Sequence, residues 1–246
     1  ESDKYQQTAA NSGNPDPTTY AIGSNLSITP FIHGLVGYWP LNEGSGTTAK
    51  DESGYAYNGV IENTSWSSLN CLTSASCLSF AGSGSGDYVY GDGSSNPNLP
   101  NEDQNSSVLS WANTATSTGG IIFAEGDSSG WGYYLGTGGS AVPGEWFVGS
   151  PTQAVSCSSM SYGTWYMLTA TYNASTRFLS IYMNGVLCNS NQLGAFTPND
   201  LGHSYNIAAS NAGPISNWDG SIELTRVYDT ILTAAQIQAI YNVEKP

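Results

Sequence analysis

From Gly34 to the C-terminus, apolar and polar residues alternate in short runs bounded by Gly, Asn, Asp and Ser. Runs of this kind, rich in Val, Ile, Tyr, Trp and Thr, predict β-strands separated by turns. The segments that fit are 35–41, 77–82, 87–91, 107–113, 119–126, 132–136, 145–149, 164–173, 178–188, 205–210 and 221–230. Asn184-Gly185 predicts a tight hairpin, because both residues tolerate positive φ. About ten to fourteen evenly spaced strands are typical of an all-β sandwich or barrel.

A single helix is predicted, near the C-terminus. Thr233 and Gln236 have the spacing of a capping box, in which each side chain satisfies a backbone N–H of the other residue. Ile237, Ile240 and Tyr241 then recur at the spacing of one helical face. We expect this helix to lie on the sandwich, and the absence of helices between the strands argues against a parallel α/β sheet.

Residues 1–33 differ from the rest of the chain. They are polar and are interrupted by Pro15, Pro17 and Pro30. The stretch Ser2–Ala10 is interpreted either as the last turns of a helix that begins upstream or as a disordered end. A chain that opens on Glu1 is expected to be a processed or truncated product. We therefore divide the sequence into an N-terminal extension, 1–33, and a domain, 34–246.

The charge of the chain restricts its partners. Five Lys and Arg stand against 19 Asp and Glu, which gives a net charge of −14 and an isoelectric point near 4.1. Nucleic acids and anionic membrane surfaces attract basic proteins, so neither is an expected partner. No apolar run is long enough to span a bilayer.

The four cysteines, Cys71, Cys77, Cys157 and Cys188, indicate an oxidising, extracellular compartment. Three pairings are compatible with the sequence. We favour Cys71–Cys77, which closes a short polar loop, together with Cys157–Cys188, which joins two strand-like segments. A zinc site is disfavoured because neither of the two His has the spacing to a Cys that a tetrahedral site requires.

Four segments in order resemble laminin-G-like jelly-roll domains of the concanavalin A-like lectin/glucanase fold. They are GLVGYWPLNEGSGTTAKDESGYAYNGVIEN, CLSFAGSGSGDYVY, GTWYMLTATYNASTRFLSIYMNGVLC and NWDGSIELTRVYDTILTAAQIQAIYN. The resemblance covers about residues 34–246. It implies a two-sheet antiparallel jelly-roll sandwich with a short C-terminal helix. It says less about function, because this fold hosts lectins, adhesins, enzymes and spacers.

The same resemblance implies a structural Ca²⁺ site. Asp51 and Asn58 match a loop of the family, and Glu223 takes the place of an acid in the closing strand that is usually Asp. Hard oxygen ligands in a Gly-rich loop suit Ca²⁺. The alternative is that Asp51 caps a turn and that Glu223 pairs with Arg226. We expect any bound ion to stabilise the loop and to take no part in chemistry.

The sequence favours binding over catalysis. Enzymes of this fold usually carry E-x-D-x-x-E or E-x-D-x-E on one strand, and neither motif occurs here. The nearest acid pairs in β context are Glu223 with Asp229 and Glu125 with Asp127. Glycosidases need two carboxylates at a defined separation. We therefore expect no enzymatic activity.

Aromatic residues beside polar residues in loops predict a glycan-binding surface, because sugars need an apolar platform together with hydrogen-bonding groups. Trp131 beside Asp127 and Trp218 beside Asp219 have this character. By contrast, the strand-borne tryptophans are expected in the core; they are Trp39, Trp111 and Trp165.

These features together predict an extracellular, lectin-type adhesion module that binds glycans or host glycoproteins. A structural or display domain without a ligand is the alternative, and a glycoside hydrolase ranks third. The polar N-terminal stretch also resembles that of modular bacterial pilins, in which a helix carries a globular module to the filament surface. That resemblance implies display on a pilus and contacts with other pilin subunits through the N-terminus.

Overall fold

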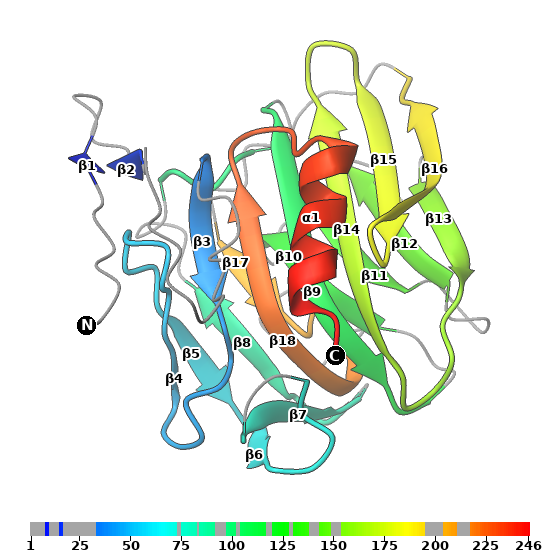
Figure 1. Ribbon diagram of the computed structural model, residues 1–246. Helices are drawn as coiled ribbons and strands as arrows, with labels where there is room; N and C mark the ends of the chain where they lie inside the picture. Colours follow the sequence, from blue (N-terminus) through cyan, green and yellow to red (C-terminus); the bar gives the residue numbers. More distant parts are fainter. Residues whose placement is uncertain are drawn as a thin grey trace.

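In a computed structural model, the chain forms two large antiparallel sheets packed face to face, with one helix outside them (Figure 1). The described residues are 8–9, 15–16 and 33–246, without 73–74, 83, 92–96, 102–103, 117–119, 128–129, 138–142, 149–153, 195–203 and 211–216. The predicted jelly-roll sandwich with a C-terminal helix is confirmed.

One sheet has the strand order β13-β12-β11-β10-β17-β8-β5-β4. These strands are β13 (Ala154–Ser159), β12 (Pro143–Val148), β11 (Gly130–Thr137), β10 (Gly120–Asp127), β17 (Tyr205–Ile207), β8 (Tyr88–Gly91), β5 (Gly59–Glu62) and β4 (Thr48–Ala49). The other sheet has the order β16-β15-β14-β9-β18-β7-β6, and β3 also pairs with β18. Its strands are β16 (Val186–Gln192), β15 (Phe178–Met183), β14 (Trp165–Asn173), β9 (Ser106–Thr114), β18 (Asp219–Tyr228), β7 (Cys77–Ala81), β6 (Ser65–Ser67) and β3 (Leu35–Trp39).

Strand β18 pairs with two strands, β7 and β3, along the same edge, because it bends in the middle. Its first residues pair with β7 and its last residues pair with β3. Between them, Leu224 has φ 53°, and its N–H bonds to Pro40 O at 3.2 Å. The register with β9 shifts at the same point, between Glu223 and Arg226. A bulge of this kind redirects a strand at a small cost in ladder hydrogen bonds.

The space between the sheets is filled by aromatic and aliphatic side chains. Trp39 on β3 packs against Tyr205 on β17 with ring centroids 4.2 Å apart, and both contact Phe123 on β10. All three are fully buried. The indole N–H of Trp39 and the hydroxyl of Tyr205 both donate to Tyr57 O, so the polar atoms of this cluster are satisfied inside the core.

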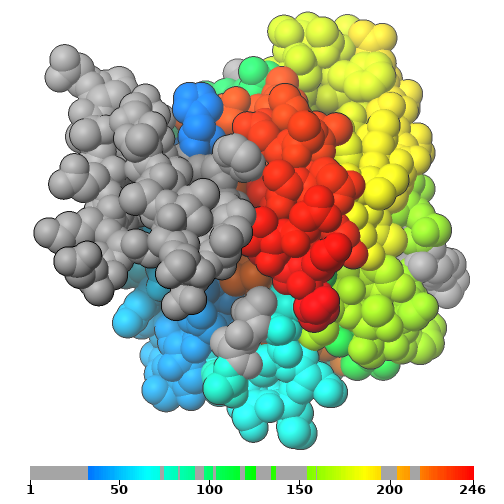
Figure 2. Space-filling view, viewed as in Figure 1, coloured from blue at the N-terminus to red at the C-terminus, as the bar shows by residue number. Residues whose placement is uncertain are grey.

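The helix α1 (Ala234–Glu244) covers the outer face of the second sheet. Figure 2 shows it in red across one side of the molecule. The predicted capping box between Thr233 and Gln236 is present, and Ile237 and Ile240 are buried against the sheet. A buried ion pair also fixes its last turn, because Arg226 Nη2 lies 2.7 Å from Glu244 Oε1.

Other local predictions have mixed outcomes. Both disulfides, Cys71–Cys77 and Cys157–Cys188, are confirmed. The hairpin is confirmed, with positive φ at Asn184 and Gly185. Trp39 and Trp111 are buried as expected. The core prediction is wrong for Trp165, whose side chain is half-buried. It packs at the edge of the apolar cluster that contains Ile237 and Ile240 of α1, and its indole N–H donates to Asn70 O.

At the N-terminus, Thr8–Ala9 (β1) pairs with Pro15–Asp16 (β2) in a two-stranded ribbon. A helix that ends at Ala10 is therefore wrong at Thr8 and Ala9. The turn-forming residues Asn11, Ser12 and Gly13 lie between the two strands and favour a reversal of the chain over helix continuation. The rest of 1–32 lies outside the described residues, and among those described no helix has the length and hydropathy to cross a membrane.

Candidate functional site

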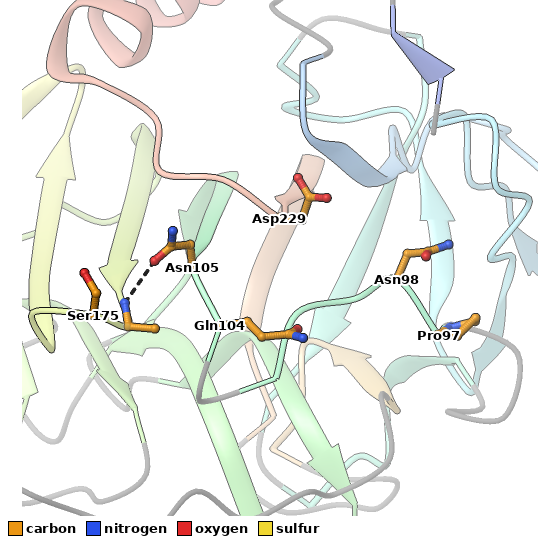
Figure 3. A pocket seen from close by; sticks show the side chains of 7 residues that line it. Pro97, Asn98, Gln104, Asn105, Ser175 and Asp229 are labelled. Carbon is orange, nitrogen blue, oxygen red and sulfur yellow. Dashed lines mark hydrogen bonds between the residues drawn. The ribbon is translucent and has the colours of Figure 1, made fainter. Parts of the chain in front are cut away.

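A cleft of about 710 Å³ opens at one end of the sandwich (Figure 3), and we call it the end cleft. Its described lining residues are Pro97, Asn98, Gln104, Asn105, Ala174, Ser175 and Asp229. They come from four places that the fold brings together: the segment after β8, the start of β9, the β14–β15 turn and the end of β18. A volume of this size is typical of small-ligand sites.

The loops at the cleft are held by their own side chains. Asn173 ends β14, and its Oδ1 accepts from Ser175 Oγ at 2.8 Å and from Thr176 N at 3.1 Å. On the other side, Gln104 Oε1 accepts from Asn101 N at 3.0 Å, and Gln104 N donates to Asn101 O. Asn and Gln stabilise turns in this way because their amides replace missing backbone partners. The cleft walls are thus ordered by bonds within each loop.

These internal bonds decide which groups a ligand would meet. Asn105 Oδ1 accepts from Ala174 N at 3.0 Å, the dashed line in Figure 3, so its NH₂ group is left as a donor. Gln104 likewise has its oxygen engaged and keeps NH₂ donors. Asn98 donates to Tyr57 Oη at 2.6 Å and keeps its carbonyl oxygen as an acceptor. The end cleft thus presents both donors and an acceptor, and the carboxylate of Asp229 is also part of its lining.

An aromatic pair lies beside the end cleft. Tyr55 stacks on Tyr57 with centroids 5.4 Å apart and an interplanar angle of 23°, and Tyr57 is tied to the cleft through Asn98. Burial raises the pKa of Tyr55, and the negative charge of Asp229 raises it further. The Tyr55 side chain is half-buried.

The sequence did not predict the end cleft. Amide side chains in a polar loop are typical of ordinary turns, and Asp229 is far from Asn98 and Gln104 in sequence. Asp229 was considered only as half of an acid pair with Glu223. The available signal was the position of these residues at strand ends that the jelly-roll topology gathers at one edge.

The predicted sugar contacts at Trp218 are corrected by the structure. Trp218 is fully buried, and its indole N–H donates to Asn113 O at 3.2 Å. Its backbone is bonded on both sides, to Ala208 O and from Gly82 N. The neighbouring Asp219 begins β18 and accepts from Thr116 Oγ1 at 2.9 Å. Trp218 therefore closes the core and offers no surface to a ligand.

The other predicted pair, Asp127 and Trp131, lies in β10 and β11, on either side of their connecting turn. In the register of the two strands, Asp127 pairs with Gly130 and Gly126 pairs with Trp131. Trp131 is thus in a strand and not in the loop that the sequence predicted. Both side chains lie outside the described part of the structure, so their role as ligand contacts stays a prediction.

The residues predicted to bind Ca²⁺ have other roles. Asp51 Oδ1 accepts from the N–H groups of Tyr38 and Ser53, at 2.8 and 2.9 Å. Its Oδ2 accepts from Ser53 Oγ and from Tyr57 N, at 2.7 and 2.8 Å. Asn58 Oδ1 accepts from Asp51 N at 2.9 Å. A calcium ion needs free oxygen ligands, whereas hydrogen-bond donors already occupy these. The set does not fit a metal, and the alternative of a loop-capping Asp51 describes it better.

Glu223 is also engaged elsewhere. It is fully buried, and its Oε1 accepts from Leu72 N at 2.6 Å, beside the Cys71–Cys77 disulfide. Its alternative partner, Arg226, pairs instead with Glu244. Among the described residues, Glu223 and the two cysteines are the one group of His, Cys, Asp or Glu with three ligand atoms within 4.8 Å. Both of those sulfurs are in the disulfide.

The sequence profile of the concanavalin A-like lectin/glucanases superfamily matches residues 83–238, which is more than half of the chain. The chain belongs to this superfamily. No curated protein has a matching sequence. The superfamily assignment agrees with the two-sheet sandwich and its end loops, on which members of this fold carry their differences.

Solved structures of the same fold include both enzymes and binding domains. A Trypanosoma rangeli sialidase with 2,3-difluorosialic acid has a TM-score of 0.61 and 15% identity, over 85% of this chain and 32% of the sialidase. A type C botulinum neurotoxin, whose cell entry depends on interaction with two ganglioside molecules, has a TM-score of 0.64 and 16% identity, over 87% of this chain and 52% of the neurotoxin chain. The binding domain of Paraclostridial Mosquitocidal Protein 1 has a TM-score of 0.64 and 13% identity, over 85% of this chain and 52% of that domain's chain. This superfamily member thus spans about a third to a half of those chains.

Proposed function

We propose that the protein is a lectin-type module that binds glycans in the end cleft. The observation that carries this proposal is the mixed set of donors and acceptors at the cleft, from the amides of Asn98, Gln104 and Asn105. A sugar hydroxyl both donates and accepts, so a glycan needs both kinds of partner close together. The superfamily and its glycan-bound and ganglioside-binding relatives support the same class of ligand.

The hydrogen-bonding side chains at the cleft are already held in place before a ligand binds, which favours a polar ligand such as a sugar. Each of these amides is already oriented by a hydrogen bond, Gln104 within its own loop and Asn98 and Asn105 to other segments, so little side-chain entropy is lost on binding. The Tyr55–Tyr57 pair, which is joined to the cleft through Asn98, supplies an aromatic ring against which the apolar face of a sugar can stack. Hydrogen bonds would then fix the orientation of the sugar, and the ring would contribute contact area.

The cleft favours binding over hydrolysis. Of its described lining residues, Asp229 alone is acidic. Hydrolysis of a glycosidic bond by the usual mechanisms requires two carboxylates on either side of it. The sialidase shares the fold, but the proposed role of this domain is recognition without bond cleavage.

The setting of the proposed function is the cell exterior. Two disulfides are consistent with an extracellular or secreted protein. We include adhesion to host glycoproteins in the proposal, with display on a pilus through the N-terminal extension 1–33. Its support is the polar sequence of that segment, which resembles modular pilins, although Thr8–Ala9 form a strand where that resemblance implied the end of a helix.

A glycan array with the purified protein tests binding, and a cleft variant tests the site. Gln104→Ala removes NH₂ donors from an exposed side chain. It should lower the affinity for the most tightly bound glycan about tenfold, because one hydrogen bond is lost. Gln238→Ala on α1 is the matched control and should bind normally. Unchanged binding by Gln104→Ala with full loss in Trp131→Ala would move the site to the β10–β11 turn. An array with no bound glycan would refute the function.

A further inference from the structure

A second cavity lies on the outer face of the second sheet, beside the start of α1. Its volume of about 380 Å³ is in the range of small-ligand sites. We call it the outer groove. The strands β14 and β15 and the segment that leads into α1 line it, chiefly with Thr171, Asn173, Phe178, Ser180, Tyr182 and 231–234.

The outer groove and the end cleft are built on the same two segments of the chain. In the β14–β15 turn, 174–175 line the end cleft, whereas Asn173 and Thr176 line the outer groove. After β18, Asp229 lines the end cleft and 231–234 line the outer groove. The two cavities are therefore neighbours across these segments, so a chain-like ligand that extends beyond the cleft can reach the groove.

An aromatic ring stands at the outer groove. Leu179 and Ile181 of β15 belong to the core between the sheets. Because successive side chains of a strand point to opposite faces, Phe178, Ser180 and Tyr182 lie on the outer face. Phe178 is 42% exposed, so an apolar surface is open to a ligand there.

Hydroxyl groups lie beside this ring. Thr171 pairs with Ser180 across β14 and β15, so their side chains are neighbours on the outer face. Neither side chain forms a hydrogen bond with another described residue, and each hydroxyl can both donate and accept. The described lining holds no charged side chain, and Arg177, which follows Thr176 in sequence, is not part of it. This combination of a ring and neutral hydroxyls suits an uncharged sugar unit.

The two shared segments are fixed to the sheet before a ligand binds. Ser107 Oγ of β9 donates to Thr230 O at 2.7 Å and accepts from Leu232 N at 2.9 Å. In the β14–β15 turn, Gln192 Nε2 donates to Thr176 O at 3.0 Å. The cleft and the groove thus keep a fixed relation to each other, which lowers the entropy cost of binding one ligand in both.

We propose that the outer groove extends the end cleft into one binding site for oligosaccharides of uncharged units, with Phe178 as the stacking platform beyond the cleft. The inference rests on the proposed function and adds a second part to its site. One end of the glycan occupies the cleft, and the following units cross the β14–β15 turn and stack on Phe178. A stacking contact with one aromatic ring changes an affinity by about fivefold to a hundredfold, by analogy with nucleobases.

Length series of glycans test this extension. Chito-, manno- and poly-N-acetyllactosamine oligosaccharides of increasing length are immobilised on one linker, and the affinity of the protein for each is measured. We expect the affinity to rise at least about fivefold from the shortest member that binds to the longest. Phe178→Ala should remove most of that rise, whereas Gln104→Ala in the end cleft should lower the affinity for every length alike.

Tyr162→Ala is the matched control. Tyr162 is 57% exposed and precedes β14, at the end of that strand opposite to the β14–β15 turn, so the whole series should be unchanged. Melting curves check that the variants fold, and Ser180→Ala, which removes a hydroxyl from the groove, should also weaken the longer members most. Equal affinity at all lengths, or a rise that Phe178→Ala leaves intact, overturns the inference and leaves the proposed function standing. Absence of binding to every glycan overturns the proposed function, and this inference with it.

Discussion

The helix α1 is held to the sheet by a buried charge pair, and this makes its last turn sensitive to a single substitution. The side chains of Arg226 and Glu244 are 3% and 8% exposed, and their closest atoms are 2.7 Å apart. Glu244 also accepts from the indole N–H of Trp111 at 2.8 Å, and the Arg226 guanidinium lies 4.3 Å from the centre of the Tyr38 ring. Burial by itself would lower the pKa of Arg226, but the charge of Glu244 outweighs it and raises the pKa.

Glu244→Gln keeps an acceptor for Trp111 and removes only the charge. The buried guanidinium is then uncompensated, which typically costs about 3–5 kcal/mol of unfolding free energy. For a domain of this size, each kcal/mol lowers Tm by about 2–4 °C, so we expect a fall of about 6–20 °C. Differential scanning calorimetry measures it, and hydrogen exchange of α1 amides shows whether the helix detaches first.

Two controls separate the charge from the general effect of mutation. Glu52→Gln removes an exposed carboxylate and should change stability by less than about 0.5 kcal/mol. The double variant Arg226→Met/Glu244→Gln removes both charges, keeps the acceptor for Trp111 and should recover most of the loss, because no ion is left alone. A fall of less than about 2 °C in Glu244→Gln would refute the argument that this pair holds the helix.

Three further outcomes are expected. Asp51→Ala should destabilise the protein by at least about 3 kcal/mol, through four lost bonds to a charged acceptor, while EDTA leaves Tm unchanged; a Ca²⁺-dependent Tm would contradict this. Loss of the Cys157–Cys188 disulfide in a Cys188→Ser variant should lower the free energy of unfolding by about 2–4 kcal/mol, as measured by denaturant titration. Burial raises the pKa of Tyr205 and Tyr228 above 10.0. The unfolded chain therefore holds fewer protons above about pH 10, and stability that is complete below that pH should fall as pH rises. The phenolate absorbance contributed by these two tyrosines should appear only on unfolding.

The features that the sequence predicted well are decided by neighbouring residues. The capping box needs only Thr233 and Gln236, three positions apart. The hairpin needs only Asn184-Gly185, whose φ values are both positive. The disulfide Cys71–Cys77 closes a loop with a sequence separation of 6. In each case the competing conformations are few, so a short pattern is enough to predict the structure.

The functional predictions depended on contacts that sequence spacing does not reveal. Trp218 stands among Asn, Asp and Gly, which suggested an exposed loop, but Asn113 and Gly82 from distant strands bury it. The sequence correctly indicated that Asp51 lies in an organised Gly-rich loop. Whether its carboxylate binds N–H donors or a cation depends partly on Tyr38, in the strand β3. The type of residue was predictable in both cases, and its partner was not.

The end cleft shows why a sandwich of this kind can change ligand without changing fold. Asn98, which follows β8 of one sheet, and Asp229, which follows β18 of the other, line the same cleft. The distance between the ends of these two strands is set by the core, where Trp39 packs against Tyr205, and no cleft residue takes part in that contact. Substitutions in the cleft should therefore alter which glycan binds at little cost in stability, whereas a truncation at Trp39 should abolish binding by moving the two sheets. Specificity in this domain thus resides in loops that the core positions but does not constrain in sequence.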